Sequence, residues 1–467
     1  MIRLKIFTIL AIFILLAISG CYDYNKLNAP TAPSSGNADF STFVSIGNSL
    51  TMGEQSGSVY ESGQMYSFGN LIAQQLNVKY AQPLFSDPGT GGRIEITSLD
   101  PFTTKINPEA GVPVNLEYPA PYNNLGIKGA FLSDVLNAVD ASTSYTAAFG
   151  SPNPLFDAVL RGLGTQLQQA MFLKPTLVTL WIGNNDILAY ATRGGLFPIT
   201  PLDAFNSNFN SILEALKSTG ADVVAGNIPN VTAIPFFTTV GPGVGLAIQA
   251  AMNSNPDIVG LVYELSVSPG IGVATPDNLF SGDVLITLSA SSAATLIGDV
   301  TGAYYTQNNI PVPPTVNTAF PFGLTPENPF PNGLLLDPVE IGNVAATISA
   351  YNSAIETAVA SYGFAMVDIN SVFNDIAVNG RVENGITFTT QYVEGNLFSL
   401  DGVHPTSQGY GIVANEFIKT MNAAFNSNIP LVDISTIPGS LPLGKVVTLG
   451  KYGIPIIPNG ALDNVLF

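Results

Sequence analysis

The stretch SLDGVHPTSQGYG, residues 399–411, contains His404, the only histidine in a chain of 467 residues. Asp401 stands three residues before it. A histidine titrates near neutral pH, so it can take a proton from a nucleophile and return it to a leaving group. A carboxylate on the other ring nitrogen fixes the tautomer and stabilises the imidazolium. The lone histidine, three residues after an aspartate, predicts the general base of a hydrolase. A helix-entry residue without chemistry is the alternative for a lone histidine.

A nucleophile for such a base stands near the start of the chain. The apolar run FVSI (43–46) predicts a buried strand, and Ser49 follows it in SIGNSLTMGE (45–54). Open α/β sheets bind ligands at the carboxyl ends of their strands. A serine hydroxyl becomes nucleophilic there once an adjacent base takes its proton. On local sequence alone, a plain Gly-Asn-Ser turn is the alternative.

Two further stretches offer donors for an oxyanion. GNND (183–186) follows the predicted strand TLVTLWI (176–182), and Asn185 can present its side-chain amide to the same cleft. NNLGIKGAF (123–131) contains Gly129, where the missing Cβ lets a backbone N–H approach a substrate oxygen. Each stretch alone is also typical of a loop, so the prediction depends on their occurring together.

The order Ser-Gly-Asn-His of these stretches resembles that of the SGNH or GDSL hydrolase family. GNSL, NLGIKGA, GNND and DGVHP look like its four blocks, and GNIPNVTAIP (226–235) is similar to the segment between its third and last blocks. The resemblance covers roughly residues 40–427. Asn48 stands where the family has an aspartate, and its amide can accept and donate hydrogen bonds but carries no charge.

The resemblance implies that Ser49 is the nucleophile, His404 the base and Asp401 its orienting residue. The oxyanion would be held by the Ser49 N–H, the Gly129 N–H and the Asn185 amide. The implied fold is a three-layer α/β/α sandwich with a five-stranded parallel sheet, the flavodoxin-like SGNH hydrolase fold, here with large insertions. The implied reaction is lipase- or esterase-type cleavage of a carboxylic ester, with no metal and no cofactor.

Alternating apolar runs and helical periodicity predict the frame that must position these residues. Such alternation is typical of a parallel sheet covered by helices on both faces. The pattern predicts strands at 43–46, 176–182, 222–229 and 364–369, and helices at 67–76, 155–172, 209–220, 340–363 and 407–425.

Two regions interrupt this alternation inside a single hydrolase domain at 40–427. Residues 80–122 are rich in proline and glycine, and residues 231–338 lack a clear period, so both are interpreted as insertions. Residues 428–467 form a C-terminal extension that either packs on the domain or extends from it.

The N-terminus predicts export. Residues 1–20 have the basic start, short apolar run and small residues of a signal peptide, and ISGC (18–21) resembles the lipobox of bacterial lipoproteins. Lipidated Cys21 would then begin the mature chain, followed by a flexible tether to residue 39. This predicts attachment to a bacterial membrane, with the outer membrane favoured, facing the periplasm or the exterior. An ordinary signal peptide with an incidental Cys21 is the alternative.

The amino-acid composition disfavours two classes of binding partner, nucleic acids and metal clusters. The formal net charge is −18, which disfavours nucleic acid. One histidine and one cysteine leave little for a metal cluster. The expected partners are a small-molecule or lipid ester and, through the anchor, the membrane, while the oligomeric state stays open.

The uncharged segment 231–252 follows the third predicted strand, at the expected cleft rim. One interpretation is a mobile apolar lid in which Phe236 and Phe237 line an acyl-binding wall beside Ser49. A buried insertion is the alternative. Function likewise keeps alternatives: a carbohydrate deacetylase or an acyltransferase using the same residues, or a binding lipoprotein that has lost catalysis.

Overall fold

A five-stranded sheet, all parallel, forms the centre of the protein in a computed structural model that describes residues 33–266, 270–439 and 447–463. Its order β11-β6-β5-β1-β4 is that of the doubly wound flavodoxin-like sheet. This confirms the predicted α/β fold with a five-stranded parallel sheet. The strands are β1 (Phe43–Gly47), β4 (Asn124–Gly126), β5 (Leu177–Trp181), β6 (Asp222–Gly226) and β11 (Ala365–Val367).

The middle strands are apolar because both faces of the sheet are covered. Every residue of β1 and β5 is buried, which is why each reads as a short continuous apolar run. The polar exceptions satisfy each other, since Thr179 Oγ1 donates to Ser45 Oγ at 2.8 Å across the two strands. β1 has β4 on one side and β5 on the other, so the strand order reverses there. In sheets of this kind ligands bind at that point of reversal.

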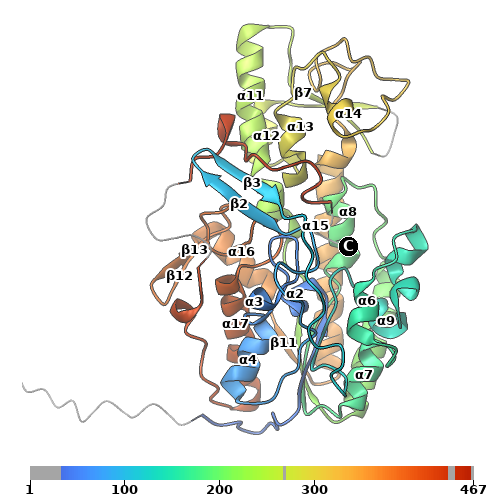
Figure 1. Ribbon diagram of the computed structural model, residues 1–467, viewed down its shortest axis with the longest axis vertical. Coiled ribbons are helices and arrows are strands. Elements are labelled where there is room, and N and C mark those ends of the chain that lie inside the picture. The colour runs from blue at the N-terminus through green and yellow to red at the C-terminus, as the bar shows by residue number, and fades with distance from the viewer. Residues whose placement is uncertain (1–32, 267–269, 440–446, 464–467) are drawn as a thin grey trace, which may run out of the picture.

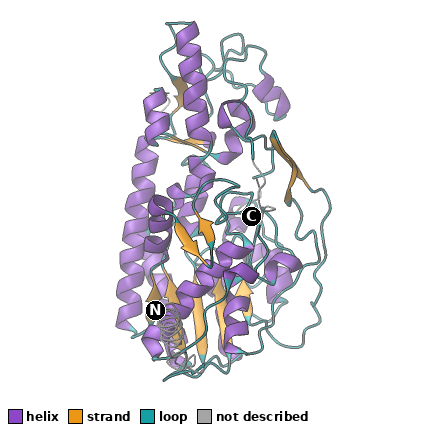
Figure 2. Ribbon diagram, turned by 90° about the vertical axis from the view of Figure 1, so that its left-hand side faces the viewer, coloured by secondary structure: helices purple, strands orange, loops and turns teal. Residues whose placement is uncertain are grey.

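Helices cover the two faces of this sheet (Figures 1 and 2). On one face α4 (Phe68–Leu76) packs against α17 (Ser407–Phe425). On the other lie α7 (Gln166–Phe172), α9 (Leu202–Ser218) and α15 (Pro338–Ser361), with α9 between α7 and α15.

The segment predicted as one helix at 155–172 is two helices, which corrects that expectation. α6 (Leu155–Leu160) ends where Arg161 adopts a left-handed φ of 53°, followed by Gly162 at 71°. α7 then starts afresh at Thr165, whose hydroxyl accepts from Gln168 N while the Gln168 side chain accepts from Thr165 N. The apolar period continues through the break, so the pattern alone did not reveal it.

The two interrupting regions have structure of their own. Residues 80–122 contain the antiparallel hairpin of β2 (Ile94–Leu99) and β3 (Phe102–Ile106). Residues 231–338 contribute most of the elements gathered at one end of the molecule (Figure 1). These are α10 (Pro235–Thr238), α11 (Val240–Ser254), β7 (Leu261–Glu264), β8 (Ile271–Ala274), α12 (Pro276–Ser281), β9 (Leu285–Ile286), α13 (Ser291–Ala294), α14 (Ala303–Gln307) and β10 (Leu335–Leu336).

Shorter elements complete the body. They are α2 (Ser49–Met52), α3 (Glu61–Gln64), α5 (Asp134–Asn137), α8 (Asn185–Thr192), α16 (Ile369–Asn379), β12 (Arg381–Glu383) and β13 (Ile386–Phe388).

The described part of the C-terminal extension packs back on the body. Ile434 and Ile437 are buried and lie against Gly411 of α17. Ile454 is also buried and lies against Gly243 of α11. These contacts resolve the choice that the sequence left open, for residues 428–439 and 447–463.

The predicted signal peptide and Cys21 lie outside the described residues. Within the described part of the chain, none of the helices combines the length and the apolar character that crossing a membrane requires.

Candidate active site

Ser49 begins α2, directly beyond the carboxyl end of β1. Asn48 caps this helix, because its Oδ1 accepts from Leu50 N at 3.1 Å. Its Nδ2 donates to Asn184 Oδ1 at 3.3 Å, which ties the loop after β1 to the loop after β5. The asparagine thus accepts the capping bond without a charge. Gly47 has no room for a side chain, since a Cβ would lie 2.4 Å from Trp181 O.

The loop before α17 folds around one carboxylate. Asp401 Oδ1 accepts from the N–H groups of Val403 and His404, both at 2.9 Å. Gly402, which lies between Asp401 and Val403, has a φ of 70°, a conformation that favours glycine. The two hydrogen bonds and the turn at Gly402 bend the loop tightly. The carboxylate of Asp401 and the imidazole of His404, three residues apart, therefore lie in contact.

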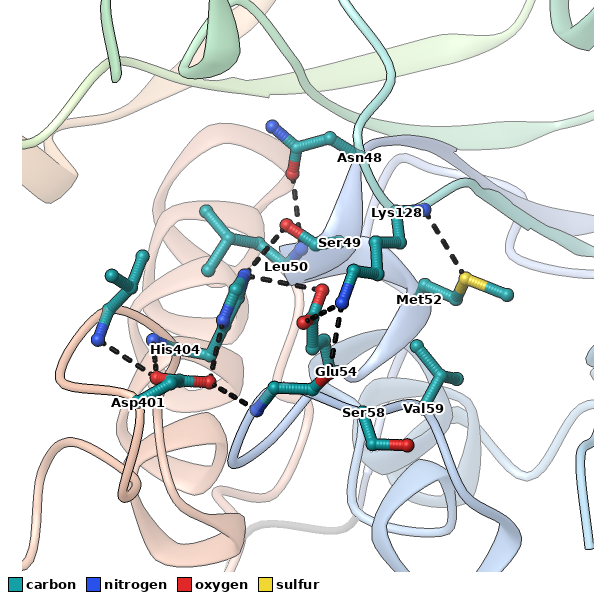
Figure 3. A network of polar contacts seen from close by, with 12 residues as sticks. Asn48, Ser49, Leu50, Met52, Glu54, Ser58, Val59, Lys128, Asp401 and His404 are labelled. Carbon is teal, nitrogen blue, oxygen red and sulfur yellow. Dashed lines mark hydrogen bonds and ion pairs between the residues drawn. The ribbon is translucent and has the colours of Figure 1, made fainter. Parts of the chain in front are cut away.

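Ser49, His404 and Asp401 form one line of contacts, although 355 residues separate the serine from the histidine (Figure 3). His404 Nε2 lies 2.9 Å from Ser49 Oγ, and His404 Nδ1 lies 3.0 Å from Asp401 Oδ2. All three side chains are buried. The structure brings together the three residues that the sequence pattern singled out.

Burial and the neighbouring charges shift the pKa values of Asp401 and His404 in opposite directions. Burial alone would raise the pKa of Asp401, but the adjacent His404 and the N–H donors of the loop lower it to about 2. Burial alone would lower the pKa of His404, yet it is raised because two carboxylates, Glu54 and then Asp401, face the ring, opposed by Lys128. The carboxylate is therefore ionised throughout the neutral range and favours a protonated imidazole.

Glu54 and Lys128 were not predicted as site residues. Glu54 is fully buried, and its Oε2 lies 3.5 Å from His404 Nε2 (Figure 3). Lys128 Nζ lies 2.7 Å from Glu54 Oε1 and donates to Gly57 O at 2.9 Å. Burial raises the pKa of Glu54, while His404 and Lys128 oppose that rise. The sequence did contain a sign that Glu54 is unusual, because it is the only charged residue between Phe40 and Tyr60, in the segment that carries Ser49.

The two predicted oxyanion donors lie on neighbouring loops. Asn185, the first residue of α8, faces the same small cavity as Ser49 and His404. Its Nδ2 donates to Ala130 O at 2.8 Å, which fixes the amide against the loop that carries Gly129. Gly129 has a φ of 76°, and no residue in the described ranges accepts a hydrogen bond from its N–H.

The cavity beside Ser49 is small and mostly apolar, with a volume of about 30 Å³. It is lined by Asn48, Ser49, Leu50, Asn184, Asn185, Leu188, Pro229, Val231, Ile234, Phe373, Phe398, Val403 and His404.

Phe236 and Phe237 do not line this cavity, which corrects the expected acyl wall. Both are buried in α10, and Phe236 N donates to Gly402 O at 3.0 Å. The start of the uncharged segment therefore packs against the loop of Asp401, in agreement with the alternative of a buried insertion. The insertion does reach the cavity through Val231 and Ile234.

A larger groove adjoins the cavity across one aromatic ring. It has a volume of about 540 Å³, and Phe398 lines both spaces. Its other lining includes Tyr60, Tyr66 and Ser399. Phe398 is buried and packs edge to face on Phe373, with ring centroids 5.8 Å apart.

One group of side chains has the composition of a cation site. Ligand atoms of Glu54, Asp401 and His404 all lie within 4.8 Å of one another. However, Lys128 places its ammonium group on Glu54, and both ring nitrogens of His404 already face Asp401 and Ser49. The positive charge that these carboxylates need is supplied by a lysine and an imidazole, so the arrangement suits proton transfer better than metal binding.

Comparisons with known proteins add little to this geometry. No family model matches the chain, and no curated protein matches it. Among solved structures the chain is similar to LAE5, described as an α/β hydrolase enzyme from the metagenome of Lake Arreo, Spain. The two chains are 11% identical, the match covers 83% of this chain and 97% of that one, and the TM-score is 0.34. So distant a likeness leaves the activity to be inferred from the site.

Proposed function

We propose that the protein is a serine ester hydrolase of the SGNH type. The observation that carries this proposal is the continuous contact from Ser49 Oγ through His404 to Asp401, at the carboxyl end of β1. A serine next to a base, with the base held by a third group, is the arrangement required for an activated nucleophile.

In the first step Ser49 Oγ attacks the ester carbonyl carbon while its proton passes to His404 Nε2. The π electrons of the carbonyl move to its oxygen, which becomes an oxyanion. Asn185 and the N–H groups of Gly129 and Ser49 are the proposed donors to that oxygen. Asp401 stabilises the imidazolium and holds the proton of Nδ1.

The tetrahedral intermediate then collapses. The carbonyl re-forms, the bond to the alcohol oxygen breaks, and His404 Nε2 gives its proton to that oxygen. A water molecule repeats the sequence on the acyl-serine: His404 takes its proton, its oxygen attacks the carbonyl carbon, and Ser49 leaves with the proton returned. The chain requires neither metal nor cofactor in this scheme.

The size of the cavity favours a short acyl group, and with it a carbohydrate deacetylase as a second candidate. A cavity needs about 10–15 Å³ to hold one water molecule, so a cavity of about 30 Å³ fits the methyl of an acetyl ester and little more. Longer chains would have to displace Leu188, Val231 or Ile234 from a packed wall, and such overpacking costs about 1–3 kcal/mol.

A series of nitrophenyl esters from acetyl to octanoyl tests both the ester hydrolase activity and the preference for short acyl groups. We expect turnover with acetate and at least about tenfold less kcat/KM with octanoate, from the overpacking cost. Ser49→Ala is the matched control for non-enzymatic hydrolysis. Octanoate as the better substrate would contradict the short-acyl proposal, and no turnover of any ester by a folded sample would favour a binding protein.

We also propose that the enzyme is held at the cell envelope through lipidated Cys21. The support is the sequence ISGC after a basic and apolar start. Several acyl chains together give stable membrane attachment, whereas one gives marginal binding. Cys21→Ser should release the protein from the membrane fraction or leave the precursor unprocessed, and unchanged fractionation would show that another anchor holds it.

A further inference from the structure

Glu54 has no place in the reaction described so far, although it is the second carboxylate at the histidine. Its side chain is fully buried, and its Oε1 accepts from Lys128 Nζ at 2.7 Å. Its Oε2 has no hydrogen-bond partner among the described residues, and it lies 3.5 Å from His404 Nε2. A buried carboxylate oxygen without a donor is costly, so its position calls for a reason.

A donor that could satisfy Oε2 is created by the reaction itself. When His404 takes the serine proton, Nε2 becomes an N–H that faces Ser49 Oγ at 2.9 Å and Glu54 Oε2 at 3.5 Å. Asp401 holds the opposite side of the ring at 3.0 Å. The imidazolium then lies between two carboxylates, whereas the neutral ring leaves Glu54 Oε2 unsatisfied.

Charge counting over the buried group supports the same conclusion. With a neutral ring, Glu54, Asp401 and Lys128 sum to one negative charge, and with the imidazolium they sum to zero. The other titratable groups packed around the carboxylates are Tyr60, Tyr392 and Tyr410, and burial raises the pKa of each, so they stay neutral. Burial raises the pKa of Glu54, and the ion pair with Lys128 at 2.7 Å opposes that rise and stabilises the carboxylate.

We propose that Glu54 is a positioning residue for His404, which accepts from the Nε2–H of the imidazolium and thereby strengthens the base. Lys128 holds the Glu54 carboxylate in that place. The inference rests on the proposed hydrolase function for its kinetic consequence, but not for the contact itself. It predicts a stronger base that is also more easily protonated, and so an enzyme whose activity is lost earlier as the pH falls.

The substitution Glu54→Gln tests the positioning role, because it should raise the relative rate at acid pH and lower the plateau kcat. A nearby opposite charge favours the charged form of an ionisable group, so removing it should leave His404 neutral at lower pH. The rate at about pH 5, relative to each enzyme's own plateau, should rise about tenfold. The plateau kcat should fall about tenfold with KM unchanged, because the transition-state imidazolium loses a counter-charge. A merely structural role would lower the plateau without moving the acid limb.

Glu340→Gln is the matched control. Glu340 is also fully buried, and its Oε1 has no hydrogen-bond partner within the residues that the structure describes. It belongs to the capping box of α15 and not to the active site. Its pH profile should coincide with that of the unchanged enzyme.

The single histidine makes a second measurement independent of turnover. In the full chain labelled with ¹⁵N-histidine, the ring signals belong to His404 alone. Their titration should move to lower pH in Glu54→Gln and stay in place in Glu340→Gln. Should Glu54→Gln not fold, Glu54→Asp supplies the test, since it keeps the charge but withdraws the carboxylate from His404 Nε2, and the titration should again move to lower pH. An unmoved titration in the folded variant overturns the role of Glu54, whereas a moved titration in a chain without esterase activity would overturn only the hydrolase function.

Discussion

Asp401→Asn should inactivate the enzyme by selecting the wrong tautomer of His404. Asp401 Oδ1 accepts from two backbone N–H groups, so the asparagine oxygen should take that place. The new Nδ2 then occupies the position of Oδ2 and faces the Gly57 N–H and His404 Nδ1. Nδ1 must now accept, so the ring proton sits on Nε2, where Glu54 Oε2 also favours it. A protonated Nε2 cannot take the proton of Ser49.

The expected kinetic loss is about 10⁴-fold in kcat, the size that a wrong tautomer produces in a serine hydrolase triad. Steady-state turnover of nitrophenyl acetate measures it. Asp368→Asn is the matched control, because Asp368 also accepts hydrogen bonds, from Ser371 and Asn227, at the N-terminus of α16. A kcat of Asp401→Asn within about tenfold of the unchanged enzyme would refute the reasoning, since a tautomer effect cannot be that small.

The same substitution has a stability consequence with a defined pH window. The pKa of Asp401 is about 2 in the folded protein, against 3.8 for an aspartate side chain with no such partners. A lowered pKa contributes stability that is complete above the unfolded value and is lost as the pH falls through the folded value. The difference corresponds to about 2 kcal/mol. Denaturant unfolding should therefore show a gap between the two proteins that shrinks by about that amount between pH 7 and pH 2. A gap of constant size would contradict the assignment.

Three further outcomes are expected. Asn185→Ala should lower kcat by about 10²–10³ with little change in KM, because it removes one of the proposed oxyanion donors; a change confined to KM would exclude that role. Ser49→Ala and His404→Ala should each abolish turnover, and the double variant should lose little more, because the two act as a unit. Phe398→Ala should join the small cavity to the neighbouring groove. Butanoyl to octanoyl esters should then gain up to about fourfold per methylene, and an unchanged acyl-length profile would show that Phe398 is no barrier.

The frame was predictable because its strands are buried on both faces. β1, β5 and β6 appear as apolar runs that end in Gly-Asn turns, and the predicted strands overlap them closely. β4 was missed because it is only three residues long and begins with buried Asn124, whose amide is satisfied by Thr51 O. A strand that depends on its neighbours for burial and hydrogen bonding carries no periodic signal of its own.

The site was predictable to the extent that its chemistry sits in short motifs. Ser49 stands just beyond β1, at the carboxyl edge of the parallel sheet. Asp401 and His404 stand in the loop before α17, and their place beside Ser49 was expected from the order of the motifs. Glu54 and Lys128 belong to different loops, and only the folded chain brings their charges to 2.7 Å. The expected lining of the cavity was wrong for a related reason. An uncharged segment can form the wall of a substrate cavity or pack into the protein core, and its sequence does not distinguish the two. Phe236 lies only two residues from Ile234, which does face the cavity.

The most direct measurement is labelling of the folded, full-length protein with a fluorophosphonate, followed by peptide mapping. The phosphorus should form one bond, to Ser49 Oγ, with loss of fluoride and transfer of the serine proton to His404. We expect the label on the peptide that contains Ser49, no label in Ser49→Ala, and strongly slowed labelling in His404→Ala. A folded protein that stays unlabelled, or that carries the label on another serine, would contradict the assignment of Ser49 as the nucleophile.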